Sequence, residues 1–126
     1  MTALLLVSHL DRVAVAVRDL IFELSGQAIV VGAVGGASGF GADLEAIESE
    51  IARLVDEGAH EIAAIGDMGS SMVLLEEVAV DAHVPILVLD APFLEGAVAA
   101  AMALATGGDA LETKMAAEEA YGIRKR

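Results

Sequence analysis

The stretch that decides the fold is TALLLVSH, residues 2–9, an apolar run that ends on a serine and a histidine. A run without polar alternation is typical of a strand that is buried on both faces, as in a parallel sheet. Apolar residues at helical spacing follow between Val13 and Leu24, and Gly26 comes directly after that segment. A buried strand followed by an amphipathic helix predicts the first unit of an α/β fold.

The same alternation continues along the rest of the chain. We predict further strands at residues 28–32, 61–66 and 84–90, and further helices at residues 44–58, 70–82, 94–105 and 110–121. Asp43 is placed to cap the helix that begins after it. Because the crossovers between parallel strands are right-handed, the helices must cover both faces of the sheet. We therefore expect residues 1–126 to form a single doubly wound α/β domain, with a mostly parallel sheet of four to five strands.

Composition excludes several classes of protein. The 126 residues include 20 acidic and 7 basic ones, for a net charge of -13, although 56% of them are apolar. An acidic surface repels phosphate backbones, so we expect no nucleic-acid partner. The absence of cysteine excludes disulfides and thiolate sites. The longest apolar run, residues 97–105, is too short to span a membrane, and the first residues do not resemble a signal peptide, so we expect a cytoplasmic protein without a membrane partner.

Polar residues gather where the predicted strands end. His9 follows the first strand, a glycine-rich loop at residues 34–41 follows the second, and Asp67 follows the third. Ligands of doubly wound sheets bind beyond the carboxyl ends of the strands, so these segments should converge. A carboxylate that accepts a hydrogen bond from one imidazole nitrogen leaves the other free to attack phosphorus. We predict a nucleophilic His9 oriented by Asp67, with no cofactor and no bound metal.

The starts of the helices after these two residues offer backbone amides to an anion. The candidate phosphate-binding residues are Gly39, Gly41, Met68, Gly69, Ser70 and Ser71, and Arg12 is the basic residue expected nearby. Structural interpretations compete with these roles, because His9 can be an ordinary loop residue and Asp67 can be the N-cap of its helix. His60 and His83 lie at the opposite ends of strands, where we expect them to be solvated.

Four motifs along the chain resemble one protein family. They are LLLVSH at 4–9, GFGAD at 39–43, GDMGSS at 66–71 and APFLEGAVAA at 91–100. They resemble the phosphotransferase subunits of phosphoenolpyruvate-dependent dihydroxyacetone kinase, a branch of the mannose-type enzyme IIA family of the sugar phosphotransferase system. The resemblance implies a homodimeric phosphotransferase with a parallel sheet, in which His9 is phosphorylated and Asp67 orients it. It also implies that the histidine phosphocarrier protein is the donor, and that the acceptor is the kinase's nucleotide-binding subunit, which holds ADP.

The sequence departs from the pattern of that family at two places. Leu10 stands where a serine usually follows the histidine, so the next helix has no hydroxyl at its start. The loop is more often GIGT, and Phe40 and Ala42 replace residues of that motif here, with the loss of one hydroxyl. Neither change affects His9 or Asp67.

Two other functions are compatible with parts of this sequence, and one feature of it predicts an oligomer. A mannose-type enzyme IIA domain that serves a sugar permease or a regulatory target would keep the same chemistry with another acceptor. A receiver domain phosphorylated on Asp67 is not favoured, because Ser8 and His9 occupy the place of its acidic pair and no lysine precedes Lys114. The apolar helix around residues 97–105 needs a cover, and for this reason we predict a homodimer.

Overall fold

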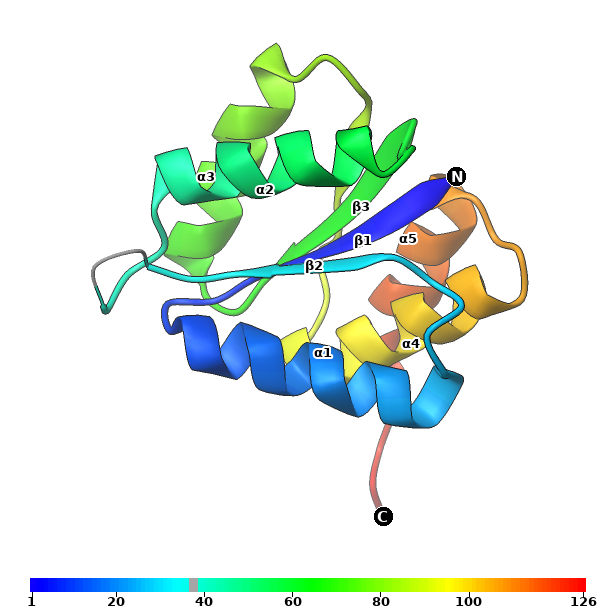
Figure 1. Cartoon of the computed structure of the whole chain (residues 1–126). Coiled ribbons are helices and arrows are strands. Elements are labelled where there is room, and N and C mark those ends of the chain that lie inside the picture. Colours follow the sequence, from blue (N-terminus) through cyan, green and yellow to red (C-terminus); the bar gives the residue numbers. More distant parts are fainter. Residues whose placement is uncertain (37–38) are drawn as a thin grey trace.

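The computed structural model describes residues 1–36 and 39–126, in which strands and helices alternate (Figure 1). The strands are β1 (Thr2–Val7), β2 (Val31–Val34), β3 (Glu61–Gly66) and β4 (Ile86–Val88). The helices are α1 (Asp11–Ser25), α2 (Leu44–Asp56), α3 (Gly69–Asp81), α4 (Phe93–Ala105) and α5 (Ala110–Glu118), followed by the short 3-10 helix η1 (Glu119–Gly122). The predicted α/β fold is confirmed.

The sheet has four strands in the order β2-β1-β3-β4, and every neighbouring pair is parallel. The two central strands end together, because Val7 of β1 is the register partner of Gly66 of β3. The chain moves outward in one direction from β1 to β2 and in the other from β3 to β4. This reversal is the point at which α/β sheets open a crevice for ligands.

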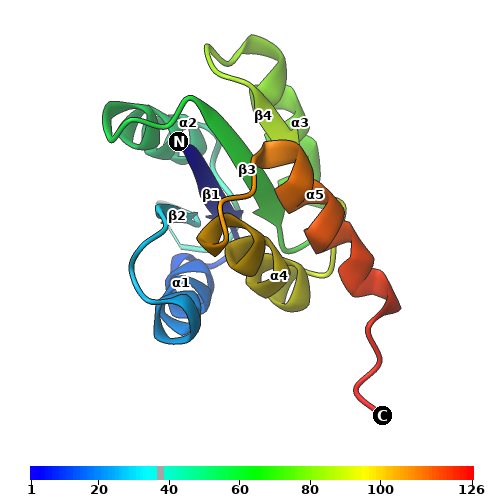
Figure 2. The ribbon, with the colours of Figure 1, turned by 90° about the vertical axis from the view of Figure 1, so that its right-hand side faces the viewer.

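Both faces of the sheet are buried, which explains the unbroken apolar run of β1. Leu4 and Leu6 pack with residues of α1, α4 and α5, whereas Leu5 and Val7 pack with residues of α2 and α3. Figure 2 shows these two groups of helices on opposite sides of the strands. Successive side chains of a strand point to opposite faces, so a strand between two helical layers must be apolar at every position.

The bounds of the two edge strands differ from the prediction. β2 begins at Val31 and ends at Val34, later than the predicted residues 28–32, because its register with β1 pairs Val31 with Leu4. β4 contains only three residues instead of the predicted residues 84–90. Pro85 has no amide hydrogen with which to extend the pairing at its start. The sequence shows which segment is apolar, but the partner strand decides which part of it pairs.

One face of the apolar helix α4 is covered by the chain itself. Ala97, Ala100 and Ala101 are completely buried against the sheet and its neighbouring helices, and α4 lies between α1 and α5 (Figure 2). Leu94 and Met102 of the same helix leave 44% and 37% of their surface exposed, so the chain covers one face of α4 and the homodimer remains a prediction. Neither α4 nor any other helix among the described residues combines the length and the apolar character needed to cross a membrane.

Candidate active site

His9 and Asp67 meet where the two central strands end. The His9 Nδ1 atom lies 3.0 Å from Oδ1 of Asp67, and the backbone amide of His9 donates to Oδ2 at 3.0 Å. Only 12% of the His9 side chain and 15% of the Asp67 side chain are exposed. One carboxylate thus binds both the ring and the backbone of the histidine, which fixes the position of the imidazole.

Two buried serines complete the environment of the carboxylate. The Ser8 hydroxyl donates to Oδ2 of Asp67 at 2.8 Å, and the Ser71 hydroxyl donates to Oδ1 at 2.9 Å. Burial opposes ionisation of Asp67, but the hydrogen bonds from the His9 amide, the His9 ring and the two serines outweigh it and hold the pKa of this carboxyl below its usual range. An ionised carboxylate only accepts hydrogen bonds, so the proton of the neutral imidazole must be on Nδ1.

The other ring nitrogen faces the beginning of α3. The Nε2 atom of His9 lies 2.8 Å from Oγ of Ser70, an exposed hydroxyl in the first turn of that helix. With the proton on Nδ1, Nε2 carries a lone pair, and Ser70 is the donor in this contact. The N-cap residue, Met68, makes no side-chain hydrogen bond to the first turn. A ring nitrogen with a lone pair therefore lies beside a helix N-terminus, which attracts anions.

The structure does not support the interpretation of Asp67 as a helix cap. Met68 occupies the N-cap position of α3, and the donors to the Asp67 oxygens are His9, Ser8 and Ser71. A true cap is found at Asp43, whose carboxylate accepts from the first-turn amides of α2, as predicted. Asp67 instead binds the ring and the backbone amide of His9.

The glycine loop packs against the histidine. The Gly41 amide donates to the His9 carbonyl at 2.8 Å, and the Gly39 amide donates to the Gly36 carbonyl at 3.4 Å, so both predicted phosphate-binding amides have partners within the chain. Both glycines have positive φ values, of 125° and 102°, which a residue with a side chain rarely adopts. They present Phe40, whose ring centroid is 5.3 Å from that of the imidazole.

The remaining predicted positions fall outside this cluster. His60 and His83 are exposed, as expected, and the imidazole of His60 contacts the N-terminal amine. Arg12 is exposed on α1. Leu10 is the N-cap residue of α1 and makes no side-chain bond to it, which agrees with the missing hydroxyl. Residues 37 and 38 of the predicted loop lie outside the described residues.

Two residues of the site, Ser8 and Phe40, are not among the predicted ones. A lone hydroxyl beside the histidine, at the end of an apolar run, is a usable signal for Ser8. Phe40 departs from a family pattern, but nothing local in the sequence indicates that it reaches the imidazole. Both contacts depend on the tertiary fold.

Comparisons with known proteins were made with the whole chain. A family model described as "EIIA-man: PTS system fructose IIA component" matches residues 3–114, a span that includes the complete site. A comparison with curated proteins gives no match.

Solved structures share the fold. The protein EF1359, described as being of unknown function, is 23% identical, with a TM-score of 0.75 and coverage of 94% of this chain and 93% of that one. The phosphotransferase system component EIIA from Streptococcus agalactiae is 18% identical, with a TM-score of 0.71 and coverage of 99% and 97%. At these identities the likeness shows the fold alone.

Proposed function

Because the chain belongs to the mannose-type EIIA family of the phosphotransferase system, a family of phosphoryl-transfer components, we propose that it carries the phosphoryl group on Nε2 of His9. The observation that supports this position is the pair of contacts on the imidazole. Asp67 binds Nδ1 at 3.0 Å, and Ser70 at the beginning of α3 lies 2.8 Å from Nε2. The ring is thus held in the tautomer that makes Nε2 the nucleophile.

The proposed donor is the phosphohistidine of the histidine phosphocarrier protein. Its P–N bond breaks, the electron pair returns to the donor ring, and the lone pair of Nε2 forms the new P–N bond. The proton on Nδ1 stays between His9 and Asp67, so no base has to remove it. Asp67 stabilises the positive charge that grows on the imidazole, as carboxylate partners of histidine do.

The oxygens of the phosphoryl group are bound at the beginning of α3 in this proposal. The Ser70 hydroxyl rotates away from the lone pair of Nε2 and donates to a phosphoryl oxygen, and the first-turn amides of Gly69 and Ser70 add to its binding. Ser71 is completely buried and donates to Asp67, so it supports the carboxylate instead of touching phosphate.

We propose the ADP-bearing subunit of dihydroxyacetone kinase as the acceptor. The support is the GDMGSS motif, residues 66–71, which forms the carboxylate and hydroxyl side of the site, together with the APFLEGAVAA motif that begins α4. In the second step the Nε2–P bond breaks and a β-phosphate oxygen of ADP forms the new bond to phosphorus, which regenerates ATP.

The first experiment tests the phosphorylation site. The protein is incubated with labelled phosphoenolpyruvate, enzyme I and the histidine phosphocarrier protein. We expect acid-labile, alkali-stable label on the wild type, on His60→Ala and on His83→Ala, and none on His9→Ala. Label retained by a folded His9→Ala variant contradicts the proposal.

The second experiment separates the possible acceptors. The isolated phosphoprotein is mixed either with the nucleotide-binding subunit, ADP and dihydroxyacetone, or with the IIB domain of a mannose-type permease. We expect label in ATP in the first mixture and none on the permease domain in the second. Transfer to the permease domain alone would assign the alternative function and keep the His9 chemistry.

A further inference from the structure

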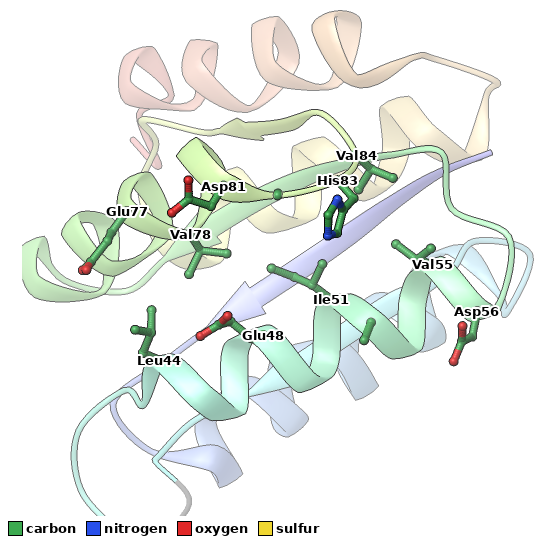
Figure 3. A pocket seen from close by; sticks show the side chains of 12 residues that line it. Leu44, Glu48, Ile51, Val55, Asp56, Glu77, Val78, Asp81, His83 and Val84 are labelled. Atoms are coloured by element: carbon green, nitrogen blue, oxygen red, sulfur yellow. The ribbon is translucent and has the colours of Figure 1, made fainter.

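An apolar groove runs between α2 and α3, on the face of the sheet opposite α1, α4 and α5 (Figure 3). It encloses about 400 Å³. Ile51 and Val78 form its buried floor, while Leu44 and Val55 along its edge each leave 37% of their surface exposed. Exposed apolar side chains at the rim of such a concave surface mark a place where another molecule can bury them.

The rim of the groove is acidic on both sides. Glu48 and Asp56 come from α2, Glu77 and Asp81 come from α3, and all four are exposed (Figure 3). Among the residues that the structure describes along this groove, none is a lysine or an arginine. The arginine of α2, Arg53, forms ion pairs with Glu50 of its own helix and with Glu57, the residue that caps it. The groove therefore combines an apolar floor with a concentrated negative charge.

The spacing of the carboxylates indicates the size of the occupant. Glu48 and Asp56 are eight positions apart on α2, which corresponds to about 12 Å along a helix at about 1.5 Å per residue. A compact organic cation cannot reach both ends of that row, and an extended polyamine that can has no apolar side to cover the floor. A helix of about three turns can, and its apolar side fits between two helices at the usual packing distance of about 8–10 Å.

We propose that this groove docks a basic amphipathic helix of a partner protein. Apolar side chains at i, i+3, i+4 and i+7 would contact Ile51, Val55 and Val78, and flanking lysines or arginines would face the four carboxylates. The basic tail of the chain itself is engaged elsewhere, because Lys125 pairs with Glu95 of α4. The hydrogen-bond partners of His9 and Asp67 among the described residues all lie outside the groove, so docking is separate from the proposed phosphoryl transfer.

The test uses a defined probe. A fluorescein-labelled 14-residue peptide of leucine and lysine, with leucines at i, i+3, i+4 and i+7, is titrated into the protein and followed by anisotropy. A peptide of the same composition in scrambled order is the control probe. We expect the amphipathic peptide to bind more tightly than the scrambled one. In a spectrum of the ¹⁵N-labelled protein, we expect the amide chemical shifts that change on adding the amphipathic peptide to belong to α2 and α3.

A matched pair of variants separates the groove from general charge attraction. Glu48→Lys with Asp81→Lys reverses two rim charges, and Asp19→Lys with Glu23→Lys makes the same change on the exposed surface of α1. We expect the first pair to weaken the peptide at least ~10-fold and the second less than ~3-fold, because close charge pairs at an interface act locally. Ala52→Trp fills the groove without changing charge and should also block the peptide.

Three results would overturn the proposal. They are equal weakening by the two charge-reversed pairs, chemical-shift changes outside α2 and α3, and binding of the scrambled peptide as tightly as the amphipathic one.

If instead the groove is occupied by a second copy of this chain, light scattering will show that Ala52→Trp dissociates an oligomer. That result would replace the partner helix with self-association. Circular dichroism confirms that each variant is folded before it is titrated.

Discussion

Asp67 is the residue on which the proposed chemistry depends. It accepts four hydrogen bonds, two of them from His9, and caps no helix. We predict that Asp67→Ala slows phosphoryl transfer from the phosphocarrier by about 10- to 100-fold, because the imidazole loses the partner that holds its tautomer. The rate is measured in a quenched-flow assay, and the urea midpoint is measured on the same sample.

Asp43→Ala is the matched control for that measurement. Asp43 is a true N-cap, and its loss should lower the free energy of unfolding by about 1 kcal/mol. The rate of transfer should fall far less in this variant than in Asp67→Ala. An Asp67→Ala protein with a lower midpoint and an unchanged rate would show that the carboxylate is structural.

The lowered pKa of Asp67 also predicts how stability depends on pH. The folded state favours the ionised carboxylate, so the unfolded state binds the proton more readily, and stability from this group rises with pH. This contribution should be complete above about pH 5 and should be lost as the pH falls below about 4, through the folded-state pKa. We therefore expect the stability difference between wild type and Asp67→Asn, from urea unfolding at each pH, to shrink below pH 4. A difference that does not change between about pH 3 and 7 would contradict this.

The ring of Phe40 lies beside the imidazole of His9. Its centroid lies 5.3 Å from that of the imidazole, and 77% of its own surface is exposed. We predict that Phe40→Ala shortens the lifetime of the phosphorylated protein, because water then reaches the P–N bond more easily. The label that remains after removal of the donor is followed with time. Phe40→Leu should keep most of the wild-type lifetime. If the lifetime of Phe40→Ala equals that of the wild type, the ring does not keep water from the P–N bond.

At the scale of the element, the first turn of α4 depends on a close approach. A Cβ atom on Gly96 would lie 2.6 Å from Cβ of Ala91, whereas a Cβ on Gly69 of α3 meets nothing within 4 Å. Helix propensity alone would make alanine stabilising by about 1 kcal/mol at either position. We predict that Gly96→Ala instead lowers the free energy of unfolding by about 1–3 kcal/mol, because the core there is overpacked. Gly69→Ala should leave it unchanged or higher, and urea titrations that rank the two variants the other way would refute this prediction.

The sequence predicted the central elements better than the edges of the sheet. β1 and β3 are buried on both faces, so each is one apolar run whose ends coincide with the ends of the strand. β2 and β4 have a neighbour on one side only, and their bounds follow from that neighbour's register. Local patterns contain no information on register between segments that are far apart in the chain.

The same limit applies to the candidate site. His9 and Asp67 could be predicted because each directly follows a strand and the topology brings strand ends together. Ser8, Phe40 and the α2–α3 groove could not, because they are defined by how a side chain turns or how two helices are spaced. A contact of this kind exists only in the packed molecule.

At the scale of the whole molecule, the homodimer remains to be tested. Val73 and Val80 of α3 are 63% and 81% exposed, and Leu111 and Met115 of α5 are each 59% exposed. These two helices pack beside the edge strand β4 on opposite faces of the sheet, and each leaves exposed apolar side chains there. We predict a dimer in light scattering at micromolar concentration and moderate salt, which screens the acidic surface. Val80→Glu should convert it to a monomer, and a monomeric wild type under the same conditions would disprove the prediction.

The adjacency of β1 and β3 also sets the order of events in folding. The His9 amide and the carboxylate that it binds are 58 residues apart in the chain. The entropy of closing so long a loop must be lost before the strands gain contacts, and such closures are slow steps. A chain still leaving the ribosome exposes its imidazole well before the carboxylate that sets the tautomer has been made. An unfinished or truncated chain should therefore accept phosphoryl groups much more slowly than a complete molecule does.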